Sequence, residues 1–424
     1  MRLLLAVAPG DWSFFPGVPM AADLFIHNIG TLLTVSGGPV ESAAVLVRDG
    51  VVSWCGLEAD CPRIPSGVES LDAEGGLVTP GLVECHTHLI YAGSRADEYE
   101  ARALGVSYQS IAGRGGGIQR TVEAVREASI DTLVELAVPR ALAMFRSGIT
   151  TIEIKSGYGL TLQDEIKILE AAGRIQNHVP VTVLRTFLGA HAIPAGTADR
   201  TAHVDAIVSE WIPEVASRGL ATFCDVFCET VAFTVAESRR IMSSAIEHGM
   251  RVKIHADQLS ASGASALAAE FGAVSADHLD HSSDRDIAAM AAAGVTGVLL
   301  PGCPVSMCRA EWLNARRFID GGMKVALSTD FNPGSSVTSN LLLMGTFGMS
   351  FMKMSAAEVW RSITADAASA LGLPPVFGTV GPGAPADMVV FDCVDFREPF
   401  YNYATDHVAA VIKAGTVRIR HHGG

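Results

Sequence analysis

The sequence contains no run of apolar residues that approaches the roughly 20 needed to span a bilayer, and its first apolar run, Met-Arg-Leu-Leu-Leu-Ala-Val-Ala, is too short for a signal peptide. None of its eight cysteines forms a Cys-x-x-Cys pair, so we expect small core residues in a reducing compartment. Positive charge is scarce: 31 Lys and Arg face 45 Asp and Glu, for a net charge of -14, which argues against a phosphate-backbone partner. We therefore expect a cytoplasmic protein that binds neither membranes nor nucleic acid.

The two ends of the chain resemble each other and differ from its middle. Residues 1–79 and 376–424 contain short strand patterns separated by turn residues. In the N-terminal part, Asp49-Gly50 sits between two apolar runs, which is typical of a β-hairpin. We predict that strands from both termini form one small β-sandwich domain, with a larger domain inserted between them.

The middle of the chain, residues 80–375, alternates between strand and helix patterns. Candidate strands end near His88, Lys155, Leu188, Glu229, His255, His278, Leu300 and Asp330. Candidate helices cover 119–147, 161–177, 201–218, 234–248, 261–271, 284–293 and 306–321. Eight parallel strands with intervening helices predict an α/β fold, a (β/α)₈ TIM barrel, whose active site lies at the carboxyl ends of the strands.

Metal-binding residue types gather at these strand ends. His86 and His88 are two residues apart at the end of an apolar run, so in an extended strand they point to the same side. His255, His278 and Asp330 close three further strands. A single His-x-His pair is often a chance surface feature, but five such residues at barrel strand ends indicate a metal-dependent enzyme.

Longer motifs carry a resemblance that runs over nearly the whole chain. They are Pro80-Gly-Leu-Val-Glu-Cys-His-Thr-His, Ala92-Gly-Ser-Arg-Ala-Asp-Glu-Tyr-Glu, Gly115-Gly-Gly-Ile, Lys155-Ser-Gly-Tyr-Gly-Leu, Phe187-Leu-Gly-Ala-His, His255-Ala-Asp-Gln-Leu-Ser, Ala276-Asp-His-Leu and Ser328-Thr-Asp-Phe-Asn-Pro-Gly-Ser-Ser. With these motifs the chain resembles the amidohydrolase superfamily and, within it, the imidazolonepropionases of histidine degradation. The resemblance implies hydrolysis of 4-imidazolone-5-propanoate to N-formimidoyl-L-glutamate by a homodimer.

The resemblance also implies the metal ligands: His86, His88, His255 and Asp330. Such a set suits Zn²⁺ or Fe²⁺ and leaves a position for water, whose pKa a bound ion lowers from about 15.7 towards about 7. Two-metal members bridge their ions with a modified lysine at the end of the fourth strand. Here that strand ends without lysine and Lys155 closes the second strand instead, so we predict one divalent ion.

Catalytic and substrate-binding positions follow from the same resemblance. His278 is placed to polarise the substrate carbonyl, Asp330 to move a proton to the leaving nitrogen, and Gln258 to read a ring nitrogen. Arg95 is the expected partner of an anionic propionate group, which the acidic surface does not exclude. Further expected substrate contacts are Tyr108, Tyr158, His191, Asn332, Gly334 and Ser335.

Two segments depart from the family pattern and leave alternatives open. Segment 303–309 stands where an aromatic-rich stretch is usual, and segment 337–354 also diverges. Both put the identity of the ring in question, so hydrolysis or desulfurisation of a related oxo- or thioxo-imidazolidine propionate remains an alternative. An amine-releasing deaminase and a non-enzymatic metal-binding barrel are more distant readings.

Overall fold

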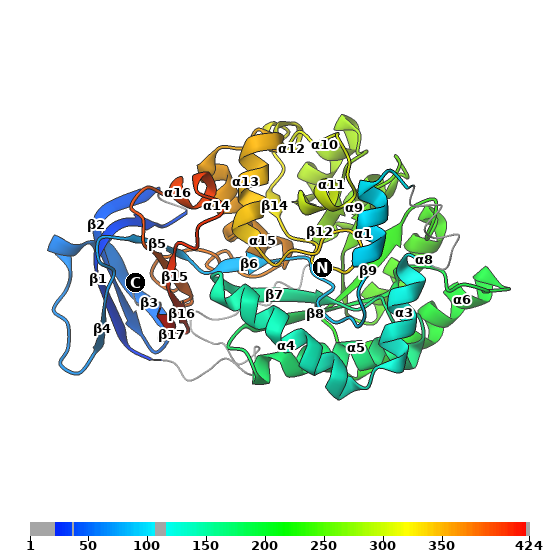
Figure 1. Cartoon of the computed structure of the whole chain (residues 1–424), viewed down its shortest axis with the longest axis horizontal. Helices are drawn as coiled ribbons and strands as arrows, with labels where there is room; N and C mark the ends of the chain where they lie inside the picture. Colours follow the sequence, from blue (N-terminus) through cyan, green and yellow to red (C-terminus); the bar gives the residue numbers. More distant parts are fainter. Residues whose placement is uncertain (1–21, 36–37, 107–115, 421–424) are drawn as a thin grey trace.

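The computed structural model describes residues 22–35, 38–106 and 116–420 of the chain. Figure 1 shows a β-rich domain at one end of the long axis and a larger domain, in which helices surround a parallel sheet, at the other. Within the described ranges, no helix is both long enough and apolar enough to cross a membrane.

The β-rich domain combines strands from both ends of the chain. Its sheet has the order β17-β16-β15-β5-β1-β2-β3, and β4 also pairs with β1. The strands are β1 (Leu24–Leu33), β2 (Pro39–Arg48), β3 (Val51–Leu57), β4 (Glu69–Asp72), β5 (Leu77–Pro80), β15 (Met388–Phe391), β16 (Val408–Lys413) and β17 (Thr416–Arg420). The antiparallel pairing of β15 with β5 joins the N-terminal and C-terminal parts of the domain. Apolar side chains from both parts share one hydrophobic core.

The predicted hairpin at Asp49-Gly50 is confirmed. Strands β2 and β3 pair antiparallel across it, and both turn residues have positive φ, 48° at Asp49 and 72° at Gly50. Ala414 and Gly415 repeat this conformation between β16 and β17. Two consecutive residues with positive φ match the right-handed twist of the paired strands, which is why such turns favour hairpins.

The larger domain is the predicted (β/α)₈ barrel, for which we propose residues 80–375 as its extent. In the described chain its parallel strands are β6 (Leu82–Glu84), β7 (Ile149–Lys155), β8 (Thr182–Ala190), β9 (Phe223–Cys228), β10 (Arg251–Val252), β11 (Ile254–Ala256), β12 (Ser275–His278), β13 (Thr296–Leu299) and β14 (Val325–Leu327). β10 and β11 are consecutive pieces of the fifth barrel strand. A parallel bridge between Thr87 and Phe331 connects the first and last strands and brings their carboxyl ends together.

Helices connect and follow the barrel strands along the chain. They are α1 (Ala96–Ala103), α3 (Ile118–Glu127), α4 (Ile130–Arg146), α5 (Leu162–Arg174), α6 (Arg200–Ala206), α7 (Ile212–Ser217), α8 (Val235–Glu247), α9 (Ala264–Phe271), α10 (Asp284–Ala293), α11 (Gly302–Ser306), α12 (Arg316–Asp320), α13 (Leu341–Met352), α14 (Ala356–Ser362) and α15 (Ala365–Ala370), with α16 (Glu398–Tyr401) following β15. Polar N-caps begin several of them: Ser129 accepts from the Thr132 N–H at the start of α4, and Thr234 forms a capping box with Glu237 at α8.

The predicted helix over 306–321 is wrong. The structure has two short helices there, α11 and α12, and the chain between them is not helical. Cys308 has a positive φ of 54°, which ends the first helix. Trp312 stacks on Phe351 of α13 with ring centroids 4.1 Å apart, so a tertiary contact replaces a helical turn.

Lys413 links the two domains. It lies on β16 of the β-rich domain, where it is 2% exposed, and its Nζ donates to Thr150 O at 3.0 Å and Thr182 Oγ1 at 2.8 Å on barrel strands β7 and β8. The same Nζ lies 2.6 Å from Asp387 Oδ2. One buried cation therefore ties both domains to each other and balances a carboxylate.

Replacing Lys413 by methionine is expected to lower the free energy of unfolding by about 3 kcal/mol, because it leaves Asp387 without its cation and removes two bonds across the domain interface. Urea denaturation followed by circular dichroism measures this change. Lys324→Met is the control, since Lys324 is exposed and its Nζ donates to Ser369 Oγ, and its effect is expected to stay within about 0.5 kcal/mol. Equal effects of the two substitutions would contradict the interdomain role.

Candidate metal centre and active site

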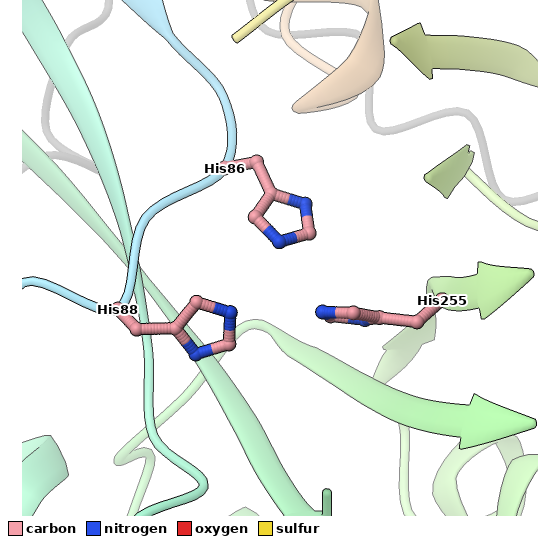
Figure 2. Close-up of side chains that lie close together, drawn as sticks. All are labelled: His86, His88 and His255. Atoms are coloured by element: carbon pink, nitrogen blue, oxygen red, sulfur yellow. The ribbon is translucent and has the colours of Figure 1, made fainter. Parts of the chain in front are cut away.

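Three histidine rings converge at the carboxyl end of the barrel. His86 and His88 follow β6, and His255 lies on β11. Figure 2 shows the three rings pointing toward one another. One nitrogen from each lies within 4.8 Å of the others, and all three side chains are buried. The His-x-His spacing places two rings on the same side of an extended segment, as the sequence predicts.

Asp330 joins this cluster from the loop after β14. Its Oδ1 lies 3.4 Å from His86 Nε2 and 3.6 Å from His88 Nε2. Its backbone has a positive φ of 50°, an unfavourable conformation for a residue other than glycine and one that recurs at functional sites. Burial raises the pKa of Asp330 to about 6. The structure therefore brings together the four side chains that the sequence proposes as ligands.

The donor atoms of this cluster fit a divalent cation. His86 Nδ1 lies 2.6 Å from Asp277 Oδ2, and His255 Nδ1 lies 3.1 Å from Asp225 Oδ1, so each Nδ1–H donates to a carboxylate. This tautomer leaves the Nε2 lone pairs of His86 and His255 facing inward, and neither has a hydrogen-bond partner among the described residues. Buried lone pairs without donors are the arrangement expected of metal-ligating imidazoles.

His278, at the end of β12, lies beside the three rings. Its ring centroid is 5.3 Å from that of His255 and 5.7 Å from that of His86. His278 and Leu279 both have positive φ, 78° and 68°, so the chain turns sharply here at a cost of order 1–3 kcal/mol for each residue. Burial lowers the pKa of His278 well below its usual value, which leaves a neutral imidazole able to donate one N–H.

A cavity of about 800 Å³ opens above the cluster. It is lined by every predicted substrate-binding or catalytic side chain that the structure describes: Arg95, Tyr158, His191, Gln258, His278, Asp330, Asn332, Gly334 and Ser335, together with His88 and His255. Tyr108, also predicted, lies outside the described residues. Distant parts of the sequence therefore meet in one pocket of the size that small-molecule sites have.

Arg95 is held rigidly at the edge of this cavity. Its Nε donates to Glu98 Oε2 at 2.8 Å, and Glu98 Oε1 accepts from the Gly117 N–H at 3.0 Å. A Cβ atom at Gly334 would lie only 2.3 Å from Arg95 Nη1, so a larger residue at this position would displace the guanidinium from its present place. The positively charged guanidinium of Arg95 is therefore held in place and faces a largely apolar pocket.

The loop after Asp330 is held by its own contacts. Asn332 Oδ1 accepts from the N–H groups of Gly334 and Ser335, each at 2.8 Å, while Asn332 Nδ2 donates to Asp330 O at 2.6 Å. Ser335 Oγ donates to Asp330 Oδ2 at 3.2 Å. These donors therefore fix the loop and orient Asp330.

The loop after β7 holds Tyr158 in the cavity wall. The buried carboxylate of Glu165 accepts from the N–H groups of Gly157, Gly159 and Leu160, each at 2.8 Å. His191 Nδ1 donates to Gly157 O at 3.0 Å, and its ring stacks on that of His88, with centroids 4.9 Å apart and planes at 12°. Burial lowers the pKa of His191 to about 3, so this ring is neutral and its Nδ1 carries the proton donated to Gly157 O.

Comparison with known proteins identifies the family. The sequence pattern described as "Amidohydrolase family" matches residues 77–418. The chain belongs to the amidohydrolase family. It is 44% identical to imidazolonepropionase of Sphingopyxis alaskensis over 388 residues, which cover 91% of this chain and 95% of that protein. It is 41% identical to imidazolonepropionase of Brevibacillus brevis, over 94% of this chain and 98% of that protein.

Solved structures share the amidohydrolase fold. The 5-methylcytosine deaminase from Klebsiella pneumoniae matches with a TM-score of 0.74 at 15% identity, covering 94% of this chain and 98% of that one. Atrazine chlorohydrolase from Arthrobacter aurescens TC1, solved with zinc, matches with a TM-score of 0.70 at 18% identity and covers 94% and 95%. Amidohydrolases are metal-dependent, and the histidine cluster places this chain in the same class.

The structure adds site residues that sequence reasoning missed. Asp225 and Asp277 accept from the histidine Nδ1 atoms, and Cys303 Sγ donates to Asp330 Oδ2 at 3.0 Å. Lys155, singled out in the sequence only because of its strand, contacts Asp225 Oδ2 at 2.7 Å. Charged residues inside otherwise apolar strands, such as Ile-Glu-Ile-Lys over 152–155, are the signal in the sequence that could have identified them.

Proposed function

We propose that this amidohydrolase hydrolyses the ring of 4-imidazolone-5-propanoate to N-formimidoyl-L-glutamate in histidine degradation. The observation that carries the proposal is the 41–44% identity, over more than 90% of the chain, to curated proteins named imidazolonepropionase. The cavity supports it independently, because it combines a histidine cluster at its base with a rigid arginine at its edge. Such a pocket suits a small anionic heterocycle.

We further propose that His86, His88, His255 and Asp330 hold one Zn²⁺ or Fe²⁺ ion. When bound, such an ion supplies a Lewis acid and lowers the pKa of a coordinated water. A single ion is supported by the charge on Lys155. Two-metal members of the family bridge their ions with a modified lysine, whereas the Lys155 ammonium group is engaged in ion pairs with three carboxylates. Burial opposes its charge, but Asp225, Glu153 and Asp277 outweigh burial and raise the pKa of Lys155 well above its usual value, so it stays a cation.

The side chains around the cluster would divide the remaining work. The Asp330 carboxylate takes a proton from the attacking water and passes it to the ring nitrogen as the carbon–nitrogen bond breaks. The neutral His278 imidazole donates its N–H to the ring carbonyl oxygen and stabilises the negative charge that develops there. Gln258, with one carbonyl and one NH₂ group, reads a ring nitrogen, and Arg95 pairs with the propionate.

The direct test is ring opening by purified, metal-replete protein. Hydrolysis removes the conjugated ring, so its ultraviolet absorbance is expected to fall and N-formimidoyl-L-glutamate to accumulate in step. Unchanged ring absorbance with metal-replete protein would refute the proposed reaction.

Arg95→Gln is expected to raise KM for this substrate about 10–100-fold with little change in kcat, because a charge-assisted pair to a carboxylate contributes about 1.5–3 kcal/mol to binding. Steady-state kinetics measures both constants. Arg174→Gln is the control, with both constants expected to stay unchanged: Arg174 also pairs with a carboxylate, that of Asp131, but it lies on α5 and does not line the cavity. A loss confined to kcat in Arg95→Gln would argue against carboxylate recognition.

A second candidate reaction is favoured by one observation. Cys303, Met307 and Arg309, all from the divergent segment 303–309, line the same cavity, and Cys303 contacts Asp330. In the described chain, segment 337–354 contributes nothing to that cavity. A related oxo- or thioxo-imidazolidine propionate, hydrolysed or desulfurised on the same metal site, is therefore the alternative. Side-by-side turnover of both ring types decides between them.

We propose a homodimer that works in the cytoplasm on a small anionic heterocycle. Two observations support a small-molecule substrate over a nucleic-acid or membrane partner. The net charge of -14 disfavours nucleic acid, and no described helix is suited to cross a membrane. Sedimentation at working concentration tests the dimer, which a monomeric, fully active protein would exclude.

A further inference from the structure

Five charged side chains form a closed cluster beneath the metal centre. Glu153 and Lys155 lie on β7, Asp225 on β9, Lys253 between β10 and β11, and Asp277 on β12. All five are essentially unexposed. Three carboxylates and two ammonium groups thus sit in the barrel interior, where each unbalanced charge carries a large desolvation penalty.

Lys155 is the point at which the two histidine-binding carboxylates meet. Asp225 contacts a different partner with each carboxylate oxygen: Oδ2 lies 2.7 Å from Lys155 Nζ, and Oδ1 accepts from His255 Nδ1 at 3.1 Å. Asp277 uses one oxygen for both partners, since Oδ2 lies 2.6 Å from His86 Nδ1 and 3.3 Å from Lys155 Nζ. One ammonium group therefore anchors the carboxylates of two different ligand histidines.

We propose that Lys155 is a positioning residue for the metal centre: by fixing Asp225 and Asp277, it orients the rings of His255 and His86. The proposal rests on the metal-binding role given to these histidines. Without the cation, two carboxylates that now share it repel each other in a medium that screens charge poorly. They would turn apart, and each imidazole would lose the acceptor that fixes its ring and keeps its Nε2 lone pair directed inward.

Lys253 provides a contrast within the same cluster. Its Nζ lies 2.8 Å from Glu153 Oε1, the carboxylate that Lys155 also contacts at 3.1 Å, and it donates to Cys85 O at 3.3 Å. Within the described part of the chain, Lys253 forms no ion pair with Asp225 or Asp277. Removing Lys253 therefore removes an equally buried cation but leaves both histidine–carboxylate–lysine chains intact.

The test is the zinc affinity of apoprotein, measured by competition with a chromogenic chelator for Lys155→Met and the matched Lys253→Met. Lys155→Met is expected to bind Zn²⁺ about 10–100-fold more weakly, the usual effect of losing support behind a ligand, and Lys253→Met to stay within about threefold of the unsubstituted protein. The visible spectrum of the Co²⁺-loaded proteins is a second readout, expected to change in shape only for Lys155→Met, because it reports the arrangement of the ligands.

Two results would overturn the proposal: unchanged zinc affinity in Lys155→Met, or an equal loss in Lys253→Met, which would indicate general damage to the core. If Lys155→Met does not fold, Asp225→Asn takes its place. It keeps the side-chain shape but removes the charge that Lys155 binds, so it is expected to weaken zinc binding at least tenfold, and unchanged affinity would refute the idea. None of these measurements uses the substrate, so protein that binds zinc but leaves the ring intact would refute the proposed reaction alone.

Discussion

His255→Ala is expected to lower kcat/KM for ring opening by at least about 10³-fold and to leave the protein with little bound metal. The substitution removes one of three imidazoles whose nitrogens converge within 4.8 Å, so the remaining donors hold a divalent ion weakly. Losing a Lewis acid costs several kcal/mol of transition-state stabilisation, and each 1.36 kcal/mol is a tenfold change in rate. Steady-state kinetics and elemental analysis of the same preparation measure both effects.

His203→Asn is the matched control for this substitution. His203 is half-buried on α6, and its Nε2 also lacks a hydrogen-bond partner among the described residues, but it does not line the cavity. Metal content and kcat/KM are expected to match those of the unsubstituted protein. Full activity in His255→Ala, or an equal loss in His203→Asn, would exclude a catalytic metal at the three-histidine cluster.

Asp330→Asn is expected to lower kcat by about 10²–10⁴-fold, the range for loss of a general acid–base group, even when metal is saturating. Asparagine keeps the shape of the side chain but cannot take a proton from water. The measurement is kcat as a function of added Zn²⁺, with bound metal determined at each point.

This titration separates two roles for Asp330. If it only binds the ion, excess metal restores turnover, because His86, His88 and His255 remain in place. If it also moves the proton, bound metal reaches the normal level while kcat stays low. Recovery of turnover in excess metal would therefore contradict the role proposed for the carboxylate.

Much of the site was predictable because it follows from local sequence. In a parallel barrel all strands end on the same side, so apolar runs that close with His88, His255, His278 and Asp330 have to deliver those side chains to one face. The spacing of His86 and His88 follows from the two-residue period of an extended chain. The turn at Asp49-Gly50 was equally local, since positive φ at both positions suits few residues.

The rest depended on contacts between remote positions. Asp277 and its partner His86 are 191 residues apart, and no periodic pattern connects them. Lys155 closes a strand, but only the structure shows that it lies between two carboxylates. The predicted helix at 306–321 failed for the same reason, because packing of Trp312 against Phe351 prevailed over local helical preference.

We propose that one divalent ion, held by His86, His88, His255 and Asp330, enables hydrolysis of the imidazolone ring. Titration of metal-free protein with Zn²⁺, followed by the rate of ring opening, tests it most directly. We expect negligible turnover without metal and a linear rise that reaches its plateau at one equivalent for each chain. Full turnover by metal-free protein, or a plateau only at two equivalents, would contradict it.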